Sequence, residues 1–145
     1  MKTILAVKNP VRKGKSSTTL ELANLMRINP ESTIIFSSIP LTDLITDFTL
    51  IIEIRGKIVA FESQGDPGTD LENRLEGIIR TYNPDIIFCT CRTRGETVAA
   101  INNIAHSYAY DIIWTSTYEA THSHNIVNKL KAEHLQDLII KLGLM

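Results

Sequence analysis

The sequence predicts a single-domain α/β fold, a three-layer sandwich in which helices cover both faces of a mainly parallel β-sheet. Short apolar runs rich in β-branched residues alternate with longer amphipathic segments, and this alternation is typical of βαβ units with right-handed crossovers. A length of 145 residues is enough for one domain with its own core. Because no repeat, low-complexity tract or long linker divides the chain, the domain is expected to span residues 1–145.

The first elements follow from apolar runs and their stop signals. The first strand is predicted over residues 1–7 and the first helix from residue 16 to about residue 27, before the stop signal Asn29-Pro30. Residues 33–37 are short and β-branched, which predicts a buried strand.

A hairpin is expected near the middle of the chain. Residues 39–46 are interpreted as a loop with one helical turn. Two apolar runs, at 48–54 and 57–61, then flank the turn signal Arg55-Gly56. One antiparallel strand is therefore expected in an otherwise parallel sheet, as in many mixed sheets.

The second half of the chain continues the alternation. Residues 62–68 are rich in turn formers, and the capping box Thr69-Asp70-Leu71-Glu72 predicts a helix that starts there. The remaining expected elements are a strand, a helix, a strand and a long helix, over residues 85–89, 97–108, 110–115 and 124–142. The residues of the last helix expected in the core are Val127, Leu130, Leu138, Ile139 and Leu142.

The segment between the first strand and the first helix, residues 7–18, has the sequence VKNPVRKGKSST. It matches the phosphate-binding pattern G-x-x-x-x-G-K-[ST] at Gly14, Lys15 and Ser16, with Asn9 in the position of the first glycine. Asn is the non-glycine residue that best tolerates a left-handed backbone, so the turn is compatible with this change. In this loop the chain resembles the P-loop NTPases, and elsewhere the resemblance is architectural.

The resemblance implies that the loop binds ATP, or another nucleoside triphosphate, together with Mg²⁺. Backbone N–H groups of such a loop point at a phosphate, and the following helix contributes the positive end of its dipole. Lys15 would reach the outer phosphates as a catalytic residue, and the Ser16 hydroxyl would bind magnesium. The expected nucleotide-binding residues of the loop are Asn9, Arg12, Lys13, Gly14, Lys15, Ser16 and Ser17. The alternative is an exposed basic loop before a helix that Ser16 or Ser17 caps.

A second signature is expected where the strand at 57–61 ends. Four apolar residues precede Glu62, which resembles the P-loop signature in which a strand-end carboxylate supports the magnesium ion. Asp66 could do the same work, so both acids are candidate metal residues beside Ser16. Gly65 lies in a segment that resembles a switch loop and could present its N–H to a terminal phosphate. The alternative for both acids is a polar turn after a core strand.

Two arginines follow the strand at 85–89. Arg92 and Arg94 are candidate catalytic residues, because a guanidinium fits phosphate oxygens and stays charged while it stabilises a transferred group. The alternative is a surface salt bridge with Glu96 or Asp66.

Charge and cysteine usage restrict the partners and the compartment. A net charge of −1 argues against a nucleic-acid partner. No apolar run approaches the roughly 20 residues of a membrane span, and the N-terminal apolar run continues into charge, unlike a signal peptide. Cys89 and Cys91, two residues apart on a predicted strand, do not bridge easily, which indicates a reduced, cytoplasmic protein.

Other motifs are weaker. A GTPase would carry N-K-x-D, whereas residues 128–131 have the sequence NKLK within a helix, so adenine nucleotides are favoured. The pair His122 and His124 is interpreted as a polar loop and helix cap in preference to a metal site.

Three hypotheses follow. The first is an ATP- and Mg²⁺-dependent enzyme, either an ATP hydrolase or a small kinase-like phosphotransferase. The second is a nucleotide-sensing or partner-binding module with little turnover, acting on a protein partner or as a homodimer; Asn9, the small size and the lack of a clear general base favour it. The third is a scaffold without a ligand, whose loop is only basic.

Overall fold

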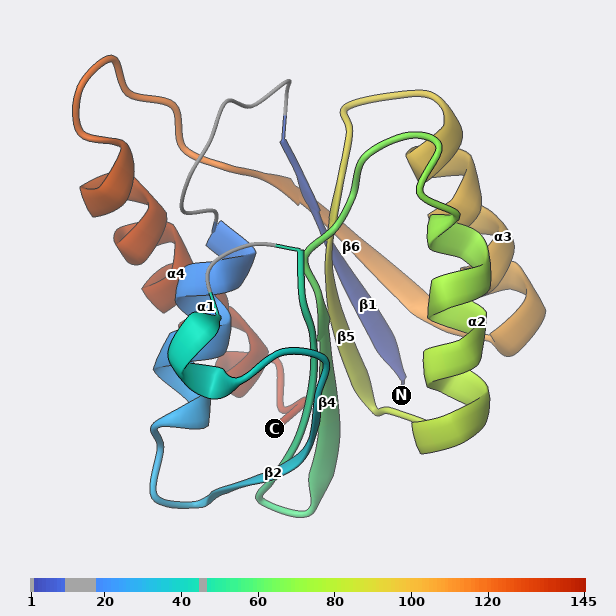
Figure 1. Ribbon diagram of the computed structural model, residues 1–145, viewed down its shortest axis with the longest axis horizontal. Coiled ribbons are helices and arrows are strands. Elements are labelled where there is room, and N and C mark those ends of the chain that lie inside the picture. The colour runs from blue at the N-terminus through green and yellow to red at the C-terminus, as the bar shows by residue number, and fades with distance from the viewer. Residues whose placement is uncertain (1, 10–17, 45–46) are drawn as a thin grey trace.

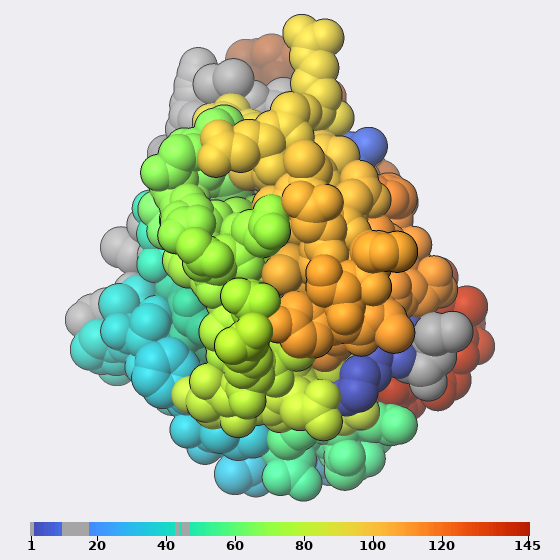
Figure 2. Space-filling model, turned by 90° about the vertical axis from the view of Figure 1, so that its right-hand side faces the viewer, coloured from blue at the N-terminus to red at the C-terminus, as the bar shows by residue number. Residues whose placement is uncertain are grey.

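The protein is an α/β sandwich in which one mixed β-sheet lies between two pairs of helices (Figure 1). The computed structural model describes residues 2–9, 18–44 and 47–145. Helices α1 and α4 cover one face of the sheet, and α2 and α3 cover the other (Figure 1). Figure 2 views the second face, with α2 and α3 side by side across it. In the described ranges no helix has both the length and the apolar content needed to cross a membrane.

The sheet has six strands in the order β2-β3-β4-β5-β1-β6. Strands β4, β5, β1 and β6 are parallel neighbours, while β3 runs antiparallel to both β2 and β4. The mainly parallel sheet with one reversed strand is therefore confirmed. The strands are β1 (Thr3–Lys8), β2 (Ser32–Ser37), β3 (Thr49–Ile54), β4 (Lys57–Glu62), β5 (Ile86–Cys91) and β6 (Asp111–Ser116).

The helices connect the strands across the two faces. They are α1 (Thr18–Arg27), α2 (Leu71–Tyr82), α3 (Glu96–Tyr108) and α4 (His124–Lys141), and a short 3₁₀ turn, η1 (Leu41–Asp43), lies where one helical turn was expected. The predicted start of the first helix at residue 16 lies outside the described residues.

Each central strand is buried on both sides, because its alternate side chains enter two different cores. Leu5, for example, packs with α1 and α4, whereas its neighbour Ile4 packs with α2 and α3. The β3–β4 turn, at Arg55 (φ 53°) and Gly56 (φ 77°), has two left-handed residues, as a tight two-residue hairpin requires.

Three sequence expectations are wrong. The capping box does not form: the residue before α2 is Asp70, in a left-handed conformation without a side-chain cap bond, and the Thr69 hydroxyl instead donates to the Asp66 carbonyl at 2.7 Å. In the segment 124–142, Leu130 and Leu142 are exposed, and the buried residues of α4 are Asn128, Ala132, Leu135 and Ile139. Finally, β2 is not a buried strand but an edge strand with exposed side chains.

Candidate functional site

The carboxyl ends of β1 and β5 lie side by side in the sheet. These two strands are parallel neighbours, yet the chain continues from β1 to α1 on one face and from β5 to α3 on the other (Figure 1). Adjacent strands whose connections leave to opposite faces form the topological switch point at which open α/β sheets bind ligands. Residues 9–17 and the connection Arg92–Gly95 both start at this point.

Most of the predicted phosphate loop falls outside the described residues: Arg12, Lys13, Gly14, Lys15, Ser16 and Ser17. Its first residue, Asn9, is described, and its backbone N–H donates to the Cys91 carbonyl at 2.8 Å. On the opposite side of β1, the Thr117 N–H donates to the Lys8 carbonyl at 3.2 Å. The start of the loop is therefore held between the ends of β5 and β6.

The start of α1 is fixed by two threonines that the sequence interpretation did not single out. The buried Thr18 hydroxyl donates to the Asn128 side-chain oxygen in α4 at 3.4 Å. The Thr19 and Thr90 hydroxyls lie 2.7 Å apart and join α1 to β5. A hydroxyl pair at the beginning of an amphipathic helix is the only sequence signal for these contacts. They fix the direction in which the helix N-terminus points.

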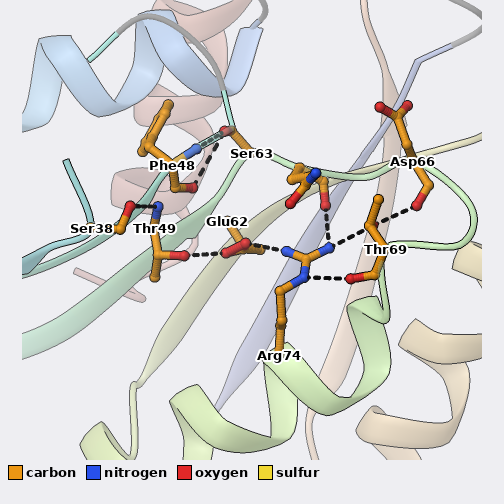
Figure 3. A network of polar contacts seen from close by, with 9 residues as sticks. Ser38, Phe48, Thr49, Glu62, Ser63, Asp66, Thr69 and Arg74 are labelled. Carbon is orange, nitrogen blue, oxygen red and sulfur yellow. Dashed lines mark hydrogen bonds and ion pairs between the residues drawn. The ribbon is translucent and has the colours of Figure 1, made fainter. Parts of the chain in front are cut away.

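Glu62 is a buried, fully paired carboxylate. Its side chain is 2% exposed, one oxygen forms an ion pair with Arg74, and the other accepts a hydrogen bond from the Thr49 hydroxyl at 2.5 Å (Figure 3). Burial raises the pKa of Glu62, and the Thr49 hydrogen bond and the Arg74 charge act in the opposite direction. Because both oxygens are engaged, Glu62 fits a magnesium ligand poorly.

Arg74, at the start of α2, clamps the loop that follows β4. Its guanidinium donates to the carbonyls of Gln64 and Thr69, both at 2.9 Å, and to the Thr69 hydroxyl at 2.8 Å (Figure 3). One feature of the sequence could have pointed to Arg74: an acid at the end of a core strand is expected to be buried and then needs a cation nearby. The sequence interpretation assigned that acid to magnesium and missed Arg74.

Gly65 lies directly against β5. A Cβ atom placed on Gly65 would lie 2.0 Å from the Thr90 carbonyl oxygen, closer than any real contact. The glycine therefore serves a close backbone approach between this loop and the strand. The backbone of residue 65 thus lies beside the switch point, where the sequence predicted a phosphate contact.

Arg92 pairs with Asp66, as in the alternative interpretation of the arginines. One guanidinium nitrogen of Arg92 lies 2.8 Å from an Asp66 carboxylate oxygen, with the side chains 25% and 58% exposed. The Arg92 backbone N–H donates to the Thr97 hydroxyl at 2.9 Å, and its buried Nε has no partner among the described residues. Arg94 is exposed on the same connection. An exposed ion pair of this kind contributes little energy and can exchange for a stronger ligand.

Lys8 adds a cation at the same edge. Its ammonium lies 4.9 Å from the centre of the Trp114 ring on β6. Burial raises the pKa of the neighbouring Cys91 thiol to about 11, and the Lys8 charge opposes this shift. The thiol is therefore neutral near pH 7, and Lys8 contributes a positive charge to this edge beside the Arg92–Asp66 ion pair.

A hollow of about 330 Å³ between the first turns of α2 and α3 does not suit a phosphate. Its lining includes the acids Asp66, Asp70, Glu72 and Glu96, which repel an anion. Over the ranges that the structure describes, no three His, Cys, Asp or Glu side chains gather in a way that could hold a metal.

No family model, no curated protein and no solved structure matches this chain.

Proposed function

We propose that the protein binds a nucleoside triphosphate, with ATP favoured, together with Mg²⁺, at the carboxyl edge between β1 and β5. The observation that carries this proposal is the place where β1 ends: it lies beside β5 at the switch point of the sheet, and residues 9–17 are the sequence between β1 and α1. A loop with Gly14, Lys15 and Ser16 in that position has the strand–loop–helix context that a phosphate loop needs.

The proposed role of each residue follows from its charge and from whether its side chain is free to contact the ligand. Lys15 neutralises the outer phosphates and Ser16 binds magnesium. Of the two acids, Asp66 is the better metal residue, because its carboxylate is exposed and its one partner among the described residues is Arg92, whereas Glu62 is enclosed by Arg74 and Thr49. When a nucleotide binds, Arg92 exchanges Asp66 for a phosphate oxygen and stabilises its charge.

The proposed activity is hydrolysis of ATP or transfer of its terminal phosphate. A second candidate, a nucleotide-sensing module with little turnover, is favoured by one observation: Glu62 and Asp66 are both engaged by arginines, so neither is a free general base in this state. Release of phosphate from ATP in the presence of Mg²⁺ separates an ATP hydrolase from the sensing module, because only the hydrolase sustains turnover above the rate of a Lys15→Ala control.

Calorimetric titration with ATP and Mg²⁺ at fixed salt tests binding itself. Charge-assisted bonds contribute roughly 1.5–3 kcal/mol, so Lys15→Ala should weaken ATP binding by about 10- to 150-fold. Arg12→Ala is the matched control: it removes an equal charge that acts through longer-range, screened attraction and should cost less. If the parent binds no ATP, or Lys15→Ala binds as well as the parent, the phosphate-loop proposal is wrong and the scaffold hypothesis replaces it.

A further inference from the structure

Strand β2 forms one edge of the sheet, and its outer side faces no other strand among the described residues. The pairing of β2 with β3 passes over Ile35, because a bulge lies between Ile34 and Phe36. Ile35 and Phe36 are 42% and 41% exposed, and Ile28, just before the strand, is 69% exposed. An edge with open backbone groups and large apolar side chains is a template for pairing with another strand.

Of the features that block such pairing, this edge carries one, the bulge between Ile34 and Phe36, and it lacks the others, charge and proline. Its sequence, Ser-Thr-Ile-Ile-Phe-Ser over Ser32–Ser37, contains no charge and no proline. The other edge strand, β6, begins with an exposed aspartate, and its Trp114 is already in contact with Lys8. In Figure 2 the β2 segment (cyan) lies at the margin of the molecule beside α2, and the Phe36 ring lies 6.1 Å from the ring of Tyr82 in α2, centre to centre. The open β2 edge is therefore the more available of the two.

The strand is also complementary to itself. About a two-fold axis between Ile34 and Ile35, an antiparallel copy places Ser32 opposite Ser37, Thr33 opposite Phe36 and Ile34 opposite Ile35. Small polar residues then meet at the ends and apolar residues meet in the centre. The nearest flanking acid, Glu31, lies at opposite ends of the pair in the two copies, so no like charges face each other.

We propose that the partner of this edge is a second copy of the chain, joined β2 to β2 in an antiparallel, two-fold dimer with one continuous sheet. A two-fold interface requires a self-complementary surface, and the Ser32–Ser37 strand provides one. A short strand with a few apolar side chains forms a small interface, so the dimer dissociates in the micromolar range. The interface is remote from β1 and β5, and dimerisation does not depend on the proposed nucleotide.

Sedimentation equilibrium of the full chain without nucleotide, from about 1 to 100 μM, tests the proposal. Ile35→Lys places a charge at the centre of the interface, on the residue that the β2–β3 pairing passes over, so it disturbs the monomer least. We expect its dimer dissociation constant to rise at least about tenfold. The matched control is Ile126→Lys on α4, at a position 62% exposed, which should dimerise like the parent.

A second variant guards against misfolding. Within the monomer, Thr33→Lys places a positive charge opposite Glu53 of β3, which is a favourable cross-strand pair. In the proposed dimer, the same lysine faces Phe36 of the second copy. The variant should retain the parent's melting temperature and lose the dimer. A parent that stays monomeric throughout the concentration range overturns the proposal, and so does a dimer that survives both Ile35→Lys and Thr33→Lys.

Discussion

At the scale of single residues, Glu62 shows why a motif alone misassigns a carboxylate. The sequence shows an acid after an apolar strand, and this pattern fits both a magnesium ligand and a buried ion pair. The deciding facts are tertiary: Thr49 comes from the antiparallel neighbour β3, and Arg74 lies 12 residues ahead on α2. Only the pairing of β3 with β4 and the packing of α2 bring the three side chains together.

The Glu62–Arg74 pair predicts a pH-dependent cost of removing the arginine. Arg74→Met leaves a carboxylate that is 2% exposed without its cation, and breaking a buried pair in this way should cost roughly 3 kcal/mol near pH 8. Burial raises the pKa of folded Glu62 above its unfolded value of 4.5, and the loss of the opposing Arg74 charge raises it further in the variant. With a raised folded pKa, the stability contributed by protonated Glu62 is present below pH 4.5 and is lost as pH rises through the folded pKa, and the variant loses more of it than the parent. Urea unfolding at pH 4.5 and pH 8 should therefore show the larger destabilisation at pH 8.

Two further variants separate this effect from loss of packing. Adding Glu62→Gln to Arg74→Met removes the buried charge and should abolish most of the pH dependence while keeping an acceptor for Thr49. Arg80→Met breaks an exposed pair with Glu76 on the same helix and should change stability little at either pH. An Arg74→Met penalty equal at both pH values would contradict the ion-pair interpretation.

At the scale of elements, the existence and type of strands and helices could be predicted, because period and stop signals are local. Which strands are buried, and which face of a helix packs in the core, could not be predicted. The strand at 33–37 has the β-branched composition of a buried strand, yet β2 lies at the edge, since strand order is set by packing of the whole sheet. Apolar residues occur around much of α4, so its sequence does not select a core face. Leu130 within the helix and Leu142 just after it are exposed instead of buried.

The contact between the β4–α2 loop and β5 gives an element-scale prediction. In Gly65→Ala the new methyl group meets the backbone of Thr90, which cannot rotate away, so the loop must shift. We expect a loss of about 1–3 kcal/mol in the free energy of unfolding, measured by urea denaturation. Gly77→Ala is the matched control: it lies within α2 with nothing within 4 Å of the new atom, and should stabilise the protein by about 0.5–1 kcal/mol. Equal behaviour of the two variants would refute the close approach.

At the scale of the whole molecule, the predicted α/β class and reversed strand are confirmed, and β1, β4 and β5 end at the same edge. The split of the helices between the two faces was not predictable, because no local pattern states which side of the sheet a helix takes. That split forms both the switch point and two cores that share the same strands.

Because the two cores share one sheet, the molecule should unfold as a single cooperative unit. Leu135→Ala removes a buried side chain from the α1/α4 core, and Ile101→Ala removes one from the α2/α3 core. Each should cost about 2–5 kcal/mol and lower the melting temperature by roughly 10 °C. In both variants the fluorescence of Trp114, the single tryptophan, which packs on the α2/α3 side, should change together with far-UV circular dichroism.

The informative variant is Leu135→Ala, because its cavity lies across the sheet from Trp114. If strands such as β1, which are buried on both faces, couple the two cores, the loss of stability in one core also destabilises the other. The fluorescence transition then shifts as far as the dichroism transition does. Leu130→Ala on the same helix, at a position 43% exposed, controls for helix propensity and should change stability within about 0.5 kcal/mol. A Leu135→Ala protein that loses helical dichroism well before its tryptophan signal changes would mean that α4 unfolds by itself and that the sheet does not couple the two cores.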